Sequence, residues 1–152
     1  MPKTLLAVSH LRQQAESDCL PVCVQMALSY LGRSVPYADL VRLLGTRWFG
    51  TPSENILRPE QLGIQVTLRE LSWAEIEAAL IRQQPVIAFV ATADLPYGST
   101  TADHVVVIVG IDEEFVYVND PYFAVAPQSV RRPSFELAQQ RFDYRCALLA
   151  LE

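Results

Sequence analysis

The sequence has few of the residues that hold metals, disulfide scaffolds or nucleic acids. It contains three cysteines and two histidines among 152 residues. An odd and small number of cysteines excludes a disulfide-rich scaffold. Cys19 and Cys23 are separated by three residues and no second close pair of ligands follows them, whereas structural zinc sites usually have two such pairs. We therefore expect no metal and no cofactor.

Positive charge is also scarce. Seventeen aspartate and glutamate residues outnumber 12 lysine and arginine residues, so the formal net charge is −5, and the longest basic cluster is Arg131–Arg132. Nucleic-acid-binding proteins normally present a basic face. The composition therefore predicts no nucleic-acid partner.

Long apolar runs are missing too. Runs such as 105–109 are far shorter than the roughly 18 residues of a transmembrane helix, and the apolar run 5–8 is too short for a secretory signal. These absences predict a soluble, cytoplasmic protein. Hydrophobic residues nevertheless make up 51% of the chain, which is enough for a core. The length is typical of one domain, so we expect residues 1–152 to form a single domain.

Helical patterns dominate the N-terminal half. Ser17 and Asp18 are typical N-cap residues, Gly32 is a typical stop, and apolar residues recur between them at helical spacing. Two capping boxes, Thr51 to Glu54 and Ser72 to Glu75, each mark the start of another helix. The predicted helices cover 19–31, 36–44, Pro52 to near Gly63, and 73–83.

Strand patterns dominate the second half. Residues 64–69 alternate between apolar and polar side chains, and 86–90 form a continuous apolar run typical of a central strand. A polar loop over 91–103 leads to a predicted hairpin of strands 104–111 and 115–119. A strand near 123–126, a helix near 134–141 and a strand at 145–151 complete the chain. Helices followed by a mostly antiparallel sheet indicate an α+β fold, with the N-terminal helices packed on the sheet.

Cys19 is the candidate nucleophile. It lies at the N-terminus of the predicted helix 19–31, where the helix dipole and free N–H groups favour the nucleophilic thiolate. The alternative is that Cys19 is a small apolar residue of the buried stripe of that helix. Cys23 lies one turn further on and Cys146 lies in an apolar terminal strand, so both are expected in the core.

His104 and Asp120 are the candidate partners of this thiol. His104 opens a strand at the end of a polar loop, where a side chain can face a cleft. A three-residue turn over 112–114 would pair Ile111 with Phe115, and that register sets Asp120 opposite Val106, on the same face as His104. A two-residue turn would separate them. His10 has no obvious partner and is interpreted as a surface residue, and Asn119 is predicted to point away from His104.

Gln13 is the candidate oxyanion donor. Its side-chain amide lies six residues before Cys19 and could donate a hydrogen bond beside the N–H of Cys19 itself; Gln14 is the adjacent alternative. A glutamine, a cysteine at a helix start, and then a histidine and an aspartate on later strands occur in the order found in papain-like enzymes. In these enzymes imidazole takes the thiol proton and the carboxylate fixes the imidazole tautomer.

Two segments resemble those of a narrower family. Residues 13–32 are similar to the active-site motif of the bacteriocin-processing cysteine peptidases, which cut leader peptides after a double glycine, and residues 104–112 followed by 116–121 are similar to the second motif of that family. The resemblance covers nearly the whole chain and is closer to stand-alone members than to transporter-fused ones. It implies a papain-like fold in which Cys19 is the nucleophile, His104 the base and acid, Asp120 its orienting residue and Gln13 the oxyanion donor. Leu20 stands where the family usually has glycine, and we expect its bulk beside the thiol.

The expected function is hydrolysis of a peptide or protein substrate, such as leader-peptide or precursor processing. The expected cleft lies between the helical half and the sheet, with Trp48, Phe49 and the loop 95–101 as candidate lining residues. The same catalytic groups also serve other thiol acyl-transfer enzymes, such as transglutaminases and deamidases. A non-catalytic peptide-binding module on the same fold is the remaining alternative.

Overall fold

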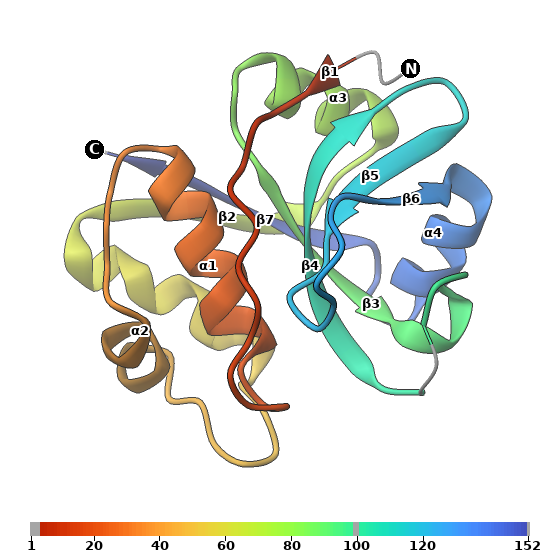
Figure 1. The fold of residues 1–152 in the computed structure, drawn as a ribbon. Helices are drawn as coiled ribbons and strands as arrows, with labels where there is room; N and C mark the ends of the chain where they lie inside the picture. The colour runs from red at the N-terminus through yellow and green to blue at the C-terminus, as the bar shows by residue number, and fades with distance from the viewer. Residues whose placement is uncertain (1–3, 99–100, 152) are drawn as a thin grey trace.

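An antiparallel sheet crosses the structure and carries most of the strands predicted after residue 60. The computed structural model describes residues 4–98 and 101–151, and within them the sheet has seven strands (Figure 1). Six strands follow the order β2-β7-β3-β4-β5-β6, and the short β1 pairs with β4. Their bounds are β1 Thr4–Leu5, β2 Ile64–Glu70, β3 Val86–Ala91, β4 Asp103–Ile111, β5 Phe115–Asn119, β6 Gln128–Arg131 and β7 Arg145–Leu151.

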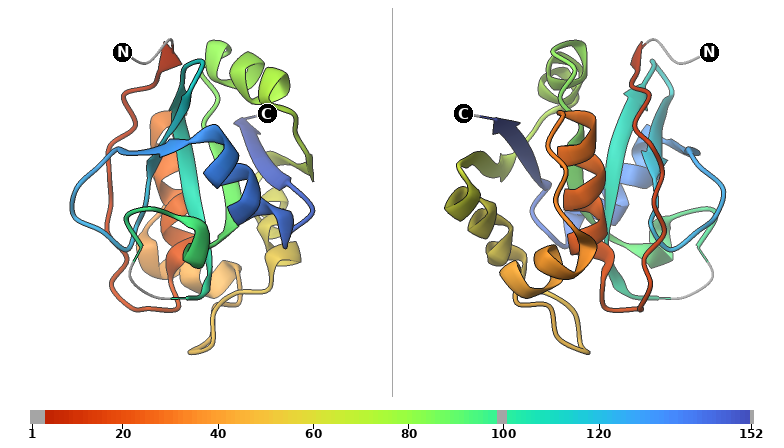
Figure 2. Two further views of the ribbon diagram at one scale, coloured as in Figure 1. Left: turned by 90° about the vertical axis from the view of Figure 1, so that its right-hand side faces the viewer. Right: turned by 60° about the vertical axis from the view of Figure 1, so that its left-hand side comes forward.

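Helices cover both faces of this sheet. Figure 2 shows α1 on one face and α4 on the opposite face. The predicted α+β arrangement, with the N-terminal helix packed on an antiparallel sheet, is therefore confirmed. The helix bounds are α1 Cys19–Tyr30, α2 Tyr37–Leu43, α3 Trp73–Ile81 and α4 Arg132–Gln140, with 3₁₀ helices η1 Ser53–Leu62 and η2 Thr92–Asp94.

The core is built around α1. Eight of its 12 residues are buried, which follows from its nearly continuous apolar sequence. Pro21 lies in the first turn, where its missing N–H costs no helical hydrogen bond. Asp18 takes the predicted N-cap position, but its side chain makes no capping bond. Its carboxylate instead accepts a hydrogen bond of 2.6 Å from the Tyr37 hydroxyl on α2.

Only one of the two predicted capping boxes forms. The Ser72 hydroxyl accepts from the Glu75 N–H at 3.2 Å, and the Glu75 carboxylate accepts from the Ser72 N–H at 3.1 Å, so α3 begins as predicted. The capping box predicted at Thr51 is wrong. Its hydroxyl bonds to that of Thr46 at 2.6 Å, and the helix that follows is a 3₁₀ helix containing Pro59, whose missing N–H disfavours an α-helix there.

The hairpin of β4 and β5 contains a bulge that sets the position of the site. Ile111 pairs with Val116 rather than with Phe115, so the predicted turn is one residue too short. The register then shifts between Ile108 and Gly110, and Val107 pairs with Asn119. Continued by one residue, this pairing sets Asp120 opposite Val106. The register expected near His104 is therefore recovered.

The strand predicted near 123–126 is wrong. This segment is a loop, and the strand that pairs with β5 is β6, which begins at Gln128. The apolar side chains of the loop gave the misleading pattern, but Val125 is 69% exposed, and the Phe123 carbonyl accepts a hydrogen bond from a side chain instead of a strand. Among the described residues, 4–98 and 101–151, no helix has both the length and the apolar character to cross a membrane.

Candidate active site

Cys19 is placed where the polypeptide changes from an exposed loop to a buried helix. It is the first residue of α1 and is partly exposed, whereas the next five residues are all buried. The loop before it is fastened to α2, because Tyr37 donates to Asp18 and also accepts a 2.8 Å hydrogen bond from the Gln14 N–H. Burial, and then the hydrogen bond to Asp18, raise the pKa of Tyr37 to about 12, so its hydroxyl remains protonated. These contacts hold the thiol at the start of α1.

His104 and Asp120 form a close buried pair. The Nε2 atom of His104, on β4, lies 2.6 Å from Oδ1 of Asp120, which follows β5. His104 is 8% exposed and Asp120 is fully buried. Burial lowers the pKa of His104, but the hydrogen bonds to Asp120 and then to Cys19 raise it, and the net result is about 9. Since Asp120 occupies Nε2, the Nδ1 atom is the one available to the Cys19 thiol.

The carboxylate of Asp120 has partners on both oxygens. Oδ1 also accepts a 3.0 Å hydrogen bond from the Tyr122 backbone N–H, and Oδ2 accepts a 2.8 Å hydrogen bond from the Tyr97 hydroxyl. A buried carboxylate needs such donors to remain charged. Tyr97 belongs to the loop 95–101 that was expected to line the cleft, but its contact with Asp120 was not predicted, and Tyr122 was not among the predicted site residues; each lies in a loop whose position depends on tertiary contacts.

Aromatic rings enclose this pair. The Tyr122 ring stands edge-on to the His104 ring with centroids 6.4 Å apart, and it contacts Phe123 at 5.2 Å. Phe123 in turn packs edge-on against Tyr97 at 5.2 Å. The three rings therefore connect the loop after β5 with the loop between β3 and β4 and shield the charged pair from water.

The segment that carries Gln13 is joined to the segment that carries Asp120. The Gln13 N–H donates to the Pro121 carbonyl at 2.8 Å, and the Arg12 guanidinium donates to the Tyr122 carbonyl at 3.2 Å. His10 donates from Nε2 to the Phe123 carbonyl at 2.6 Å, while its Nδ1 atom is buried without a partner. The interpretation of His10 as a surface residue without a partner is therefore wrong.

Gln13 reaches the same cavity, but its amide is already engaged. Its Nε2 atom donates to the carbonyls of Ala15 and Glu16 at 2.9 and 3.0 Å, and its Oε1 atom is buried without a partner. The two amide hydrogens are thus both used within the loop before α1. In this conformation Gln13 organises that loop around Cys19.

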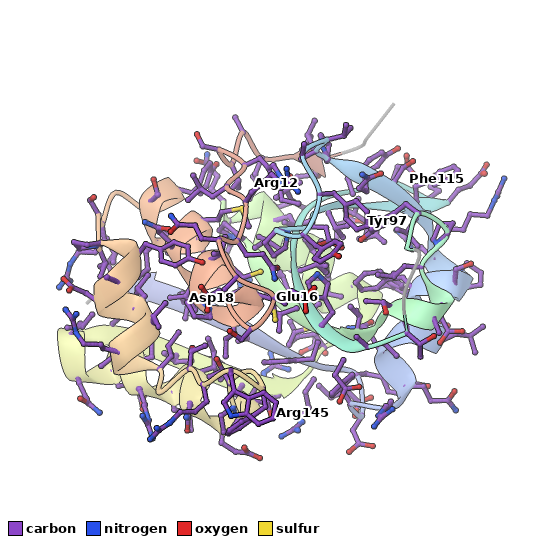
Figure 3. All side chains as sticks on the ribbon, turned by 60° about the horizontal axis from the view of Figure 1, so that its bottom comes forward. Arg12, Glu16, Asp18, Tyr97, Phe115 and Arg145 are labelled. Carbon is purple, nitrogen blue, oxygen red and sulfur yellow. The ribbon has the colours of Figure 1, made fainter. Side chains whose placement is uncertain are left out.

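The candidate residues open into one cavity of about 550 Å³. Glu16, on the loop before α1, and Tyr97, on the loop after β3, both line it and are labelled in Figure 3. The expected lining by Trp48 and Phe49 is confirmed; they are 89% and 66% exposed. Of the expected loop 95–101, residues 99 and 100 lie outside the described residues. The lining comprises Gln13, Glu16, Ser17, Cys19, Trp48, Phe49, Gly50, Thr92, Leu95, Tyr97, Gly98, Ala102, Asp103, His104, Asp120, Tyr122 and Phe123.

Several other sequence-based expectations concern neighbours of the site. Leu20 is 1% exposed, packs in the core and is not among the residues that line the cavity. Cys23 is fully buried, and burial raises its pKa well above the ordinary value. Burial likewise raises the pKa of Cys146 to about 12. Asn119 points away from His104, as predicted, and donates to the Val8 carbonyl at 3.1 Å.

No metal-binding group is found in the part of the chain that the structure describes. Within 4–98 and 101–151, no cluster of three or more histidine, cysteine, aspartate or glutamate side chains could hold an ion. The residues that line the cavity supply a thiol, an imidazole and carboxylates.

With Cys19 at the first residue of α1, His104 on β4 and Asp120 directly after β5, the structure has a papain-like fold. Residues 5–145 match the Peptidase_C39 like family, and the chain belongs to that family. No curated protein shows significant similarity.

Several solved structures share this fold. A C39-like peptidase from Bacillus anthracis superimposes with a TM-score of 0.81 at 18% identity, covering 98% of each chain. The peptidase domain of Streptococcus ComA, a bifunctional ABC transporter in a quorum-sensing pathway, has a TM-score of 0.78 at 18% identity and covers 95% of this chain and 99% of its own. A double glycine motif protease from an AMS/PCAT transporter, solved with its leader peptide, has a TM-score of 0.73 at 17% identity, covering 99% and 96%.

Proposed function

We propose that the protein is a cysteine peptidase in which Cys19, His104 and Asp120 form the catalytic triad. The observation that carries the proposal is the short hydrogen bond between His104 and Asp120 in a cavity that Cys19 also lines. Cys19 also raises the pKa of His104, an effect that requires the thiol to be close to the imidazole, and this supports the same assignment. We also propose that residues 1–152 constitute one peptidase domain.

The reaction follows from these positions. His104 accepts the thiol proton of Cys19, and the sulfur attacks the carbonyl carbon of the scissile peptide bond. The tetrahedral intermediate collapses when the C–N bond breaks and His104 returns the proton to the leaving amine. Water, deprotonated by His104, then hydrolyses the thioester and regenerates the thiol. Asp120 holds the imidazole in the required tautomer and stabilises its charged form.

The oxyanion of the intermediate needs two donors. The backbone N–H of Cys19 is one, because the first N–H groups of a helix have no partner within the helix. The amide of Gln13 is the other. Since its two hydrogens are bonded to the carbonyls of Ala15 and Glu16, one of these hydrogen bonds is exchanged for the oxyanion when substrate binds.

The proposed substrate is a peptide or protein precursor with a cleavable leader. The fold likeness to a double glycine motif protease bound to its leader peptide supports this substrate class. Leu20 is no obstacle to it, because its side chain is directed into the core and does not line the cavity. A double glycine before the scissile bond is therefore compatible with the site.

Incubation of the purified chain with synthetic peptides tests the proposal. One peptide carries a Gly-Gly pair before the cleavage position, and a matched peptide carries Leu-Leu there; products are identified by mass spectrometry. We expect the wild type to cleave the first peptide and Cys19→Ala to cleave neither. Equal cleavage by Cys19→Ala would exclude Cys19 as the nucleophile.

The same assay separates the alternative functions. An added primary amine is incorporated into the product by an acyl-transfer enzyme, whereas a peptidase releases the free acid. A non-catalytic binding module would retain the Gly-Gly peptide and leave it intact. Either result from the wild-type protein would replace the peptidase proposal.

A further inference from the structure

Tyr97 contacts the proposed triad from outside it. It lies on the loop between η2 and β4, and its hydroxyl donates to Oδ2 of Asp120 at 2.8 Å. The other carboxylate oxygen, Oδ1, is directed at His104 and also accepts the Tyr122 N–H. Asp120 is therefore held by donors from two loops as well as from β4.

We propose that Tyr97 is a positioning residue that fixes the rotation of the Asp120 carboxylate and so keeps Oδ1 directed at His104. The inference rests on the proposed function, because the orientation of His104 matters only if this imidazole serves Cys19. Tyr97 acts through Asp120 and takes no part in bond formation.

Because Asp120 is buried, its hydrogen bond with the Tyr97 hydroxyl determines the orientation of the carboxylate. Asp120 is fully buried, so Oδ2 has no bulk water to replace the Tyr97 hydroxyl. A carboxylate that loses a buried partner rotates toward another donor or admits a water molecule. The donors that would attract it, the Tyr122 N–H and His104, both already serve Oδ1. Rotation of the carboxylate or entry of a water molecule would therefore disturb the hydrogen bond between His104 and Asp120.

The Tyr97 side chain is suited to this role. Its ring packs edge-on against Phe123 with centroids 5.2 Å apart, which fixes the direction of the hydroxyl. Burial, and then the negative charge of Asp120, raise the pKa of Tyr97 above its ordinary value. The Tyr97 hydroxyl therefore stays protonated at neutral pH and donates to Asp120.

A tyrosine elsewhere in the chain provides a matched control. The Tyr117 hydroxyl donates to Oδ2 of Asp112 at 2.5 Å, and neither residue lines the cavity. Tyr97→Phe and Tyr117→Phe thus each remove one hydroxyl from a tyrosine–aspartate hydrogen bond. Any difference between them reports on the location of the bond.

Two readouts on the full chain test the inference without a peptide substrate. The first is the rate at which iodoacetamide alkylates Cys19, followed by mass spectrometry. The second is the low-field proton NMR signal of the His104–Asp120 hydrogen bond. For Tyr97→Phe we expect alkylation to slow about tenfold, the scale on which loss of a supporting hydrogen bond acts, and the NMR signal to move. Tyr117→Phe should match the wild type in both.

The inference is overturned if Tyr97→Phe folds and matches the wild type in both readouts. If that variant does not fold, 3-fluorotyrosine incorporated at position 97 keeps the ring and makes the hydroxyl a stronger donor. An unmoved NMR signal in that protein overturns the inference equally. Failure of the proposed function is a separate result, since it is measured as peptide cleavage by Cys19→Ala, and neither readout on Tyr97 depends on cleavage.

Discussion

The Nε2 atom of His104 lies 2.6 Å from Oδ1 of Asp120, and this buried contact couples protonation of the imidazole to folding. Burial lowers the pKa of His104, yet the hydrogen bonds to Asp120 and Cys19 raise it from 6.5 to about 9. A group whose pKa is higher in the folded state stabilises the fold when it is protonated. This contribution is complete below pH about 6.5 and disappears as the pH rises through about 9.

Asp120→Asn should therefore flatten the pH dependence of stability. The substitution removes the carboxylate charge that favours the imidazolium, so the free energy of unfolding should fall most below pH about 6.5 and approach the wild-type value above pH about 9. Urea unfolding across this range measures the difference. A constant difference at every pH would show that the imidazole does not titrate through Asp120. Asp112→Asn, on the hairpin turn, is the matched control.

The three cysteines should differ sharply in reactivity. Cys19 lines the cavity, whereas Cys23 and Cys146 are fully buried and burial raises the pKa of both. Iodoacetamide should therefore modify Cys19 alone in the folded protein. His104→Gln should slow this reaction about tenfold or more, because the base that accepts the thiol proton is lost. Mass spectrometry assigns the modified residue, and rapid labelling of Cys23 would contradict the burial of α1.

The register of β4 and β5 shows how far the sequence alone predicts the site. The predicted register holds at the pairing of Val107 with Asn119, next to the site, although the pairing of Ile111 with Phe115 behind it does not. The longer turn is built by the Asp112 carboxylate, which accepts from the N–H groups of residues 114 and 115 at 2.8 and 2.7 Å. A bulge then restores the register that buries the apolar face of the hairpin.

The contacts that loop residues make with Asp120 could not be predicted from the sequence, for a physical reason. Cys19, His104 and Asp120 lie on or beside regular elements, whose apolar periodicity predicts where each begins and ends. Tyr97 and Tyr122 reach Asp120 from loops, where no periodicity exists and position depends on contacts with distant segments. Phe123 is an example: the apolar residues around it suggested a strand, but the segment is a loop in which the Phe123 carbonyl accepts a hydrogen bond from His10.

Gln13 should matter for rate more than for binding. If its amide donates to the oxyanion, Gln13→Ala should lower kcat by about 10²–10³ with little change in KM. Gln14→Ala is the adjacent control, because its contact with Tyr37 is made by the backbone N–H. Kinetics on a cleaved peptide measure both. An effect of Gln13→Ala on thermal stability alone would instead restrict the residue to organising the loop around Ala15 and Glu16.

Trp48 and Phe49 should contribute to substrate binding. A tight turn presents them, with hydrogen bonds of 2.9 Å in both directions between Arg47 and Gly50, and their rings pack edge-on at the cavity. Trp48→Ala should raise KM several-fold and leave kcat and stability nearly unchanged, since the side chain is 89% exposed. Leu137→Ala, at an exposed position of α4 outside the cavity, is the control, and an equal KM in both variants would exclude Trp48 from the substrate contact.

Leu20 should act on stability and leave specificity unchanged. Its side chain is 1% exposed among the apolar residues that surround α1, so Leu20→Ala should lower the free energy of unfolding by roughly 2–5 kcal/mol. Because the side chain does not line the cavity, the ratio of cleavage rates for the Gly-Gly and Leu-Leu peptides should stay at the wild-type value at a temperature where the variant remains folded. Urea unfolding and peptide kinetics measure the two effects separately. A changed ratio with unchanged stability would place Leu20 at the substrate after all.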